Sequence, residues 1–276
     1  MTRASPGAPV ARPWPPLLRL VAGLHGVALL LLLLCAPRLW PWALALVLLG
    51  HGVISVLSLV PRTRWLGPNL VRLAPAQARR GEVAITIDDG PDPRTTAAVL
   101  DILQAYDARA SFFCIGERVA RYPELTREIV RRGHGVENHT ARHAHDFALL
   151  GPRGYRAELA AGQALIEAVT GVPPRYLRAP AGFRNPFCWG ALDAIGLRLA
   201  SWTRRGFDTR DGDAARVLRR LLRGLAAGDI LLLHDGNCAL GAHGEPVILQ
   251  VLPRLLDELR ARGLRATALP RAPEAT

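Results

Sequence analysis

Two long apolar segments near the amino terminus constrain this chain more than any other feature. Residues 20–36 and 39–60 each approach the roughly 20 apolar residues that an α-helix needs to cross a bilayer. Only Pro37 and Arg38 separate them. Because such a short connection allows only antiparallel neighbours, the sequence predicts a transmembrane hairpin over residues 17–60. Both chain ends would then lie on one side of the membrane.

A secretory signal peptide is the alternative interpretation of the first segment, with Leu29 to Leu34 as its apolar centre. A second full-length apolar segment directly after it favours two retained spans. The flanking arginines number three before the first span, one in the turn and five after the second span. The positive-inside rule therefore places the tail of residues 1–16 and the region after the hairpin in the cytoplasm. The membrane expected is the inner (cell) membrane of a bacterial-type cell. Cleavage, or a single span with export, would place that region on the periplasmic side instead.

The net charge of +12 suggests nucleic-acid binding at first sight, but its composition argues against it. All 35 basic residues are arginine, which indicates a compositional bias. No helix or loop concentrates these arginines with aromatic residues between them, so we expect no nucleic-acid partner. The four cysteines form no C-x-x-C pair, so neither a zinc ribbon nor a dense disulfide framework is indicated.

Short apolar strands alternate with helical segments over residues 82–272, after a Pro-, Arg- and Gly-rich linker at 61–81. The predicted strands cover residues 83–88, 110–115, 135–138, 176–178, 197–202, 230–234 and 264–269. The predicted helices cover residues 94–106, 123–132, 155–170, 186–195, 214–227 and 246–262. Seven strands with interleaved helices predict an α/β fold with a parallel sheet, and roughly 190 residues suit closure into a distorted (β/α) barrel.

Polar clusters follow the predicted strands at their carboxyl ends, where such barrels carry their chemistry. Asp88 and Asp89 end the first strand, and the turn at Gly90-Pro91 would have to twist the chain for both acids to serve one site. His139 and His143 follow the third strand. Two imidazoles four residues apart on one helical turn can hold one metal ion. Taken alone, these clusters are also typical of a turn and of solvent-facing histidines.

Three further clusters follow the later strands. A segment from Arg178 to Arg184 follows the fourth strand, Trp202 and Asp208 follow the fifth, and His234 ends a hydrophobic strand before Asp235. Any one cluster could be structural. Five clusters at five strand ends indicate one active site.

The order of these clusters resembles the polysaccharide deacetylase family, also called NodB-homology or chitin-deacetylase-like, over roughly residues 82–270. T-I-D-D-G-P matches the family's T-F-D-D-G-P, H-T-A-R-H its H-S/T-x-x-H, R-A-P-A-G-F its R-x-P-x-G-Y/F, and L-L-L-H-D its final L-x-H. Two positions depart from the pattern: Ile87 replaces the usual phenylalanine, and Thr209 stands where tryptophan is usual after Asp208. The second departure bears on the shape of the acetyl pocket and therefore on which substrate fits, but not on the chemistry.

The resemblance implies a role for each matching residue. Asp89, His139 and His143 would hold a divalent metal ion, with Asp88 as general base and His234 as general acid. One carboxylate and two imidazoles leave positions open on the ion, as a catalytic site requires. The ion expected is Zn²⁺, and Co²⁺ or Ni²⁺ would also suit these ligands.

The remaining matches concern orientation and charge. By resemblance, Arg178 pairs with Asp88, and Asp208 hydrogen-bonds His234 and raises its pKa. Gly182 and Phe183 would form the wall that binds the substrate, with a backbone N–H near Phe183 as second donor to the oxyanion.

The resemblance implies a metal-dependent hydrolase that removes the N-acetyl group from an amino sugar. A cytoplasmic-facing domain at the bilayer suggests a lipid-linked or nascent glycan, whereas an outward-facing one suggests peptidoglycan or an exported polysaccharide. Three alternatives remain. An inactive domain would bind a glycan in the same groove, an esterase would remove O-acetyl groups, and a structural membrane protein would need no strand-end histidines.

Overall fold

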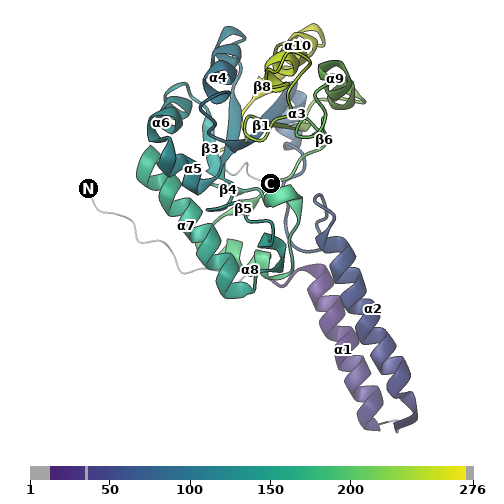
Figure 1. Cartoon of the computed structure of the whole chain (residues 1–276). Helices are drawn as coiled ribbons and strands as arrows, with labels where there is room; N and C mark the ends of the chain where they lie inside the picture. The colour runs from purple at the N-terminus through teal and green to yellow at the C-terminus, as the bar shows by residue number, and fades with distance from the viewer. Residues whose placement is uncertain (1–12, 35–36, 272–276) are drawn as a thin grey trace.

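The computed structural model describes residues 13–34 and 37–271, so most of the predicted tail of residues 1–16 lies outside the described part. Two long helices, α1 (Pro16–Leu34) and α2 (Trp40–Ser58), pack side by side and extend away from a larger α/β domain (Figure 1). The two helices therefore form the antiparallel pair that the short connection predicts.

The helix pair has the composition of a membrane-spanning hairpin. Each helix has 19 residues and is long and apolar enough to cross a bilayer. Large apolar side chains stay exposed along it, among them Leu33 and Leu34, each 72% exposed. Trp40 and Trp42 are exposed at the end distant from the domain, and Trp65 is exposed at the near end, where its carbonyl accepts a hydrogen bond from the first turn of α1. Tryptophan at both ends is typical of the two membrane interfaces.

The α/β domain contains one curled sheet in which all strand pairs between named strands are parallel. The strands lie in the order β5-β4-β3-β2-β1-β7-β6, and β8 pairs with the first residues of β1. Their bounds are β1 Glu82–Gly90, β2 Ala110–Cys114, β3 Gly135–Asn138, β4 Tyr176–Leu177, β5 Arg198–Leu199, β6 Arg204–Arg205, β7 Ile230–His234 and β8 Arg265–Thr267. The predicted distorted (β/α) barrel is confirmed. The predicted strand at 197–202 is shorter, and a separate β6 follows Trp202.

Helices cover the outer face of this sheet (Figure 1). They are α3 Pro75–Arg79, α4 Thr96–Ala105, α5 Gly116–Arg121, α6 Pro123–Arg131, α7 Pro152–Thr170, α8 Phe187–Ile195, α9 Ala214–Leu222 and α10 Ile248–Ala261. Successive side chains of β1 point to opposite faces of the sheet. Val83, Ile85 and Ile87 pack in the core beneath the helices, whereas Ala84 packs inside the barrel. Asp88 therefore faces the barrel interior at the end of β1.

Residues 59–74, which we call the strap, connect α2 to the barrel. The sequence predicts a linker here, and the structure shows an irregular segment with several turns that packs against the open side of the sheet. Leu70 pairs with Ala200, because its N–H donates to Leu199 at 2.9 Å and its carbonyl accepts from Ser201 at 2.8 Å. The strap thereby fills the gap between the two edge strands, β5 and β6.

Candidate active site

Asp88 and Asp89 both contribute to one cavity, although adjacent residues of a regular strand point to opposite faces. The pairing of β1 with β2 shifts register between Asp88 and Gly90, and Asp89 has a φ of 72°. This bulge turns the Asp89 side chain inward. The Asp89 carbonyl accepts a hydrogen bond of 2.9 Å from Arg118 on α5, a helix that the sequence analysis missed.

His139 and His143 lie in the loop after β3. The helical turn predicted for them is wrong, because Thr140 and His143 have φ values of 66° and 56°. Asn138 holds the loop in place: its side chain accepts from the Thr140 N–H at 2.7 Å and donates to Leu159 on α7 at 2.9 Å. The two imidazoles are still brought together, with ring centroids 4.7 Å apart.

Three atoms that could bind one metal ion lie close together, one each from Asp89, His139 and His143. Oδ1 of Asp89 lies 3.1 Å from Nε2 of His139 and 3.4 Å from Nε2 of His143. That oxygen is buried and accepts no hydrogen bond, whereas Oδ2 accepts one from Asn237 at 3.1 Å. Nδ1 of His139 is 2.8 Å from the Arg178 carbonyl, which can only accept, so the lone pair of His139 lies on Nε2. These residues fit a divalent metal ion.

The charges around this point also favour a cation. Burial lowers the pKa of His139, but the carboxylates of Asp88 and Asp89 raise it overall above its usual value. Burial raises the pKa of Asp89, yet the neighbouring imidazoles hold it well below its usual range. Burial and the nearby His139 lower the pKa of His143 to about 4, so its imidazole is neutral at neutral pH.

Arg178 joins the second carboxylate to the rest of the site. Its side chain is 1% exposed, and Nη1 donates to Oδ1 of Asp88 at 2.7 Å and to the hydroxyl of Thr86 at 2.7 Å. Nη2 donates to the Ser201 carbonyl at 3.0 Å, and the guanidinium lies 4.1 Å from the ring centre of Phe113. These contacts fix the guanidinium and thereby the orientation of Asp88.

His234, which pairs with Asp88 across the parallel strands β7 and β1, forms a buried pair with Asp208. Oδ1 of Asp208 lies 2.9 Å from Nδ1 of His234, and Oδ2 accepts from the main-chain N–H of the same residue at 2.8 Å. Burial lowers the pKa of His234, but the Asp208 carboxylate raises it overall above its usual value. The Nε2 of His234 is left available to a substrate, since His234 lines the cavity.

The segment after β4 forms one wall of the cavity. The N–H groups of Gly182 and Phe183 donate to the carbonyls of Ala179 and Pro180 at 2.8 and 3.0 Å. Ala181 lines the cavity with a φ of 52°, and no hydrogen bond in the described part of the chain uses its N–H. Of the backbone N–H groups near Phe183, that of Ala181 is therefore the one with no protein acceptor among the described residues.

These residues surround a cavity of about 270 Å³. It is lined by Asp88, Asp89, His139, His143, His145, Ala179, Ala181, Gly182, Trp202, Arg205, Thr209, Arg210, Leu232, His234 and Asn237. The sequence analysis did not single out Arg205, Arg210 or Asn237. No local signal marks them, because Arg205 ends the short strand β6, and Arg210 and Asn237 reach the cavity through the loops after β6 and β7.

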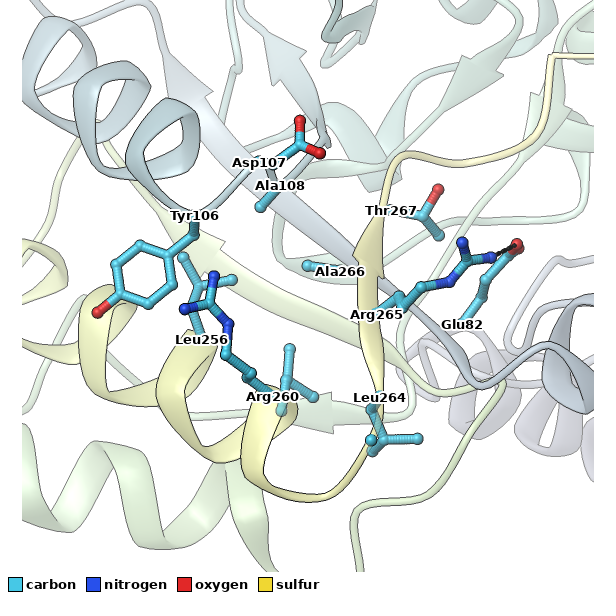
Figure 2. Close-up of a pocket in the computed structure, with 12 residues that line it drawn as sticks. Glu82, Tyr106, Asp107, Ala108, Leu256, Arg260, Leu264, Arg265, Ala266 and Thr267 are labelled. Carbon is cyan, nitrogen blue, oxygen red and sulfur yellow. Dashed lines mark hydrogen bonds and ion pairs between the residues drawn. The ribbon is translucent and has the colours of Figure 1, made fainter.

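A larger cavity, of about 720 Å³, lies at the amino-terminal ends of the strands (Figure 2). Its charged lining includes Glu82 at the start of β1 and Arg265 on β8, whose side chains pair at 3.1 Å. None of its described lining residues is a histidine or cysteine. The smaller cavity, at the carboxyl ends of the strands, is the one that both His139 and His143 line.

Comparison with known proteins identifies the family. The family model for polysaccharide deacetylases matches residues 76–200. A peptidoglycan-N-acetylglucosamine deacetylase of Bacillus cereus is 31% identical over 66% of this chain and 84% of its own length. A chitooligosaccharide deacetylase of a Bradyrhizobium species is 34% identical over 68% of this chain and 89% of its own length. The chain belongs to the polysaccharide deacetylase family. This polysaccharide deacetylase is thus a hydrolase by family.

Solved structures share the fold of this polysaccharide deacetylase. One, from Bacillus anthracis and described as a pseudoenzyme, has a TM-score of 0.65 and 22% identity, and the match covers 73% of this chain and 67% of that one. The fold alone therefore does not guarantee catalysis.

Proposed function

We propose that this polysaccharide deacetylase is an active, metal-dependent enzyme that hydrolyses the N-acetyl amide of an amino sugar in a glycan or lipid-linked saccharide. One observation carries the proposal: the buried Asp89 Oδ1 accepts no hydrogen bond and meets two imidazole Nε2 atoms beside both Asp88 and His234. A binding domain would need a groove but no such set. The same geometry therefore favours catalysis over an inactive glycan-binding domain.

Asp89, His139 and His143 would hold the metal. One carboxylate and two imidazoles suit Zn²⁺, and also Co²⁺ or Ni²⁺. When bound, such an ion lowers the pKa of a water molecule and polarises a carbonyl oxygen. Oδ2 of Asp89 is held by Asn237 and Nδ1 of His139 by the Arg178 carbonyl, so both ligands are fixed before the ion binds.

Asp88 would accept the proton of the attacking water. Its Oδ2 lies 3.9 Å from Nε2 of His139, so it reaches the same point as the ligands without joining them. Its other oxygen is occupied by Arg178, whose charge compensates for burial of the carboxylate. Asp88 thus has one free oxygen for general base catalysis.

His234 would give a proton to the leaving amine. The amine of an amide is a poor leaving group unless it is protonated, so the imidazole must carry its charge when the bond breaks. Asp208 binds Nδ1 and raises the pKa of His234, which keeps the proton on Nε2. The N–H of Ala181 is the donor that the wall offers to the developing oxyanion.

The names of the relatives and the helix pair suggest the kind of substrate. The two relatives are named for peptidoglycan N-acetylglucosamine and for chitooligosaccharides, so we infer a glycan that contains N-acetylglucosamine. We also infer that α1 and α2 span the cell membrane and that the catalytic domain faces the cytoplasm. The supporting observations are the exposed apolar helices and the arginine counts of three, one and five.

The activity is tested with the full chain in detergent. Oligomers of N-acetylglucosamine are incubated with it and analysed by mass spectrometry, and we expect products that have lost acetyl groups, together with free acetate. The double variant Asp88→Asn/His234→Ala is the matched control and should give neither. Release of acetate from O-acetyl esters alone, with the amide left intact, would contradict the proposal.

A further inference from the structure

Three large apolar side chains are exposed on the domain beside the active-site wall. Leu149 is 85% exposed, Phe187 50% and Phe183 38%, whereas core residues of the same domain are almost fully buried. They come from two separate segments, the loop before α7 and the segment around the start of α8. We call these three residues the rim patch. Exposure of such side chains in one place indicates a contact surface.

Asn185 holds the rim patch together. Its side-chain amide donates to the carbonyls of Ala148 and Leu150 at 2.9 Å each, so Leu149 lies directly against it. Phe187 donates its N–H to the side-chain oxygen of Asn185 at 2.9 Å. The two segments are thereby fixed relative to each other, and the apolar side chains project from a rigid base.

The rim patch lies at the level where the hairpin ends. The N–H of Arg184 donates to the carbonyl of Ser58, the last residue of α2, at 3.1 Å. The guanidinium of Arg184 is buried and donates to the carbonyls of Pro61 and Thr63 at 3.0 and 2.7 Å. In Figure 1, α8 lies next to the domain end of the hairpin. If the hairpin spans a bilayer, its membrane interface passes beside Phe183 and Phe187.

The charge of this face complements an anionic membrane surface. Residues 1–81 contain no aspartate or glutamate, and neither do residues 147–157 or 176–192. The same segments carry arginines, among them Arg62, Arg64, Arg153 and Arg156. Three acidic residues border these segments: Asp146, which is exposed, Asp193, which is half-buried, and Glu158, which is buried. The arginines of the face outnumber them. Arginines around an apolar patch are the combination that binds anionic lipid headgroups and the acyl region beneath them.

We propose that the rim patch inserts into the lipid bilayer next to the hairpin, so that the catalytic cavity opens at the membrane surface. Ala181 and Gly182 line the cavity directly before Phe183, so one short segment joins the cavity wall to the membrane contact. The substrate class that fits such a site is a saccharide linked to a membrane lipid. This assignment of substrate rests on the proposed deacetylase function, whereas the membrane contact does not.

Lipid contact is measured by photo-crosslinking. A benzophenone amino acid replaces Leu149 or Phe187 in the full chain, reconstituted into vesicles of phosphatidylethanolamine and phosphatidylglycerol. Leu240 is the matched control: it is 58% exposed and lies in the loop between β7 and α10, and α10 is distant from the hairpin in Figure 1. We expect protein–lipid adducts from positions 149 and 187 and none from 240. Adducts to a second protein copy, or no lipid adducts at 149 and 187, would overturn the proposal.

The consequence for catalysis is measured with two probes. Leu149→Ser/Phe187→Ser should lower deacetylation of a synthetic N-acetylglucosaminyl dialkylglycerol in these vesicles at least about fivefold, because interfacial binding scales with buried apolar area. The rate with a soluble N-acetylglucosamine oligomer should stay unchanged, and Leu240→Ser should affect neither. Equal loss with both probes would contradict the membrane role. Inactivity of the unaltered protein would refute the proposed function, while the crosslinks would still decide the membrane contact.

Discussion

The main-chain carbonyl of Arg178 lies 2.8 Å from Nδ1 of His139, while the guanidinium of the same residue binds Asp88 at 2.7 Å. One residue thus fixes both the ring of a proposed metal ligand, His139, and the carboxylate of the proposed general base, Asp88. The two contacts use different parts of Arg178. Substitutions can therefore test the proposed metal ligand and the proposed general base independently of each other.

Substitutions at Asp88 and His139 should have different effects. Asp88→Asn keeps an oxygen for Arg178, so we expect the metal to stay bound while kcat falls by ~10² to 10⁴, the usual contribution of general base catalysis. His139→Ala should lose the metal itself. Metal content by mass spectrometry and acetate release distinguish the two effects. His145→Ala, at the same cavity but outside the ligand set, is the control that should keep the metal. Loss of the ion from the Asp88→Asn variant would mean that Asp88 is the metal ligand and Asp89 the general base.

Asp208 sets the pH at which His234 loses its proton. A general acid works only while protonated, and the Asp208 carboxylate raises the pKa of His234. Asp208→Asn keeps a hydrogen-bond acceptor but removes the charge, so the pKa of His234 should fall. The high-pH limb of the kcat profile should then move to lower pH. An unchanged limb would exclude His234 as the acid that this limb reports.

We expect the catalytic domain to need the strap for its stability and activity. A Cβ on Gly182 would lie 2.5 Å from Pro61, which shows how closely the strap supports the cavity wall. A chain that begins at Gly81 loses the hydrogen bonds of Arg184 to the carbonyls of Pro61 and Thr63, and it also loses the buried side chain of Leu73 from the inner core. We expect this chain to melt at a lower temperature and to lose most activity, whereas a chain that begins at Leu59 retains both. Equal activity of the two would show that the strap is dispensable.

The sequence alone predicted the barrel and the positions of its polar clusters because both depend on local patterns. Short apolar runs alternate with helical spacing, and each cluster stands where a strand ends. The sequence could not predict that the Asp89 side chain points into the cavity, because this direction depends on a register shift against β2 and a positive φ. The nonhelical loop of His139 and His143 likewise depends on the contact of Asn138 with α7.

The strap shows a second limit of local patterns. Its prolines, arginines and glycine correctly indicate the absence of long helices and strands. Its partners are distant in sequence, however: Leu70 pairs with Ala200, and Arg62 donates to the Thr203 carbonyl at 3.2 Å. A linker and a packed segment therefore look alike in sequence. The rim patch is similar, because its two segments meet only through Asn185.

The side of the membrane on which the domain lies can be read from fusions. With arginine counts of three, one and five around the spans, we expect both chain ends in the cytoplasm. Alkaline phosphatase fused after Thr276 should be inactive, and green fluorescent protein at the same position should be bright. Strong phosphatase activity, or a mature protein that begins after Ala36, would place the domain outside and favour wall or exported glycans as substrates.

The most direct test of the central claim is a metal titration of the full chain, followed by acetate release from N-acetylglucosamine oligomers. After exhaustive chelation, the account predicts no activity, and activity that returns in proportion to added Zn²⁺ until one ion is bound per chain. His139→Ala should neither bind the ion at this stoichiometry nor recover. Full activity of a chelated protein that contains no metal would contradict the account.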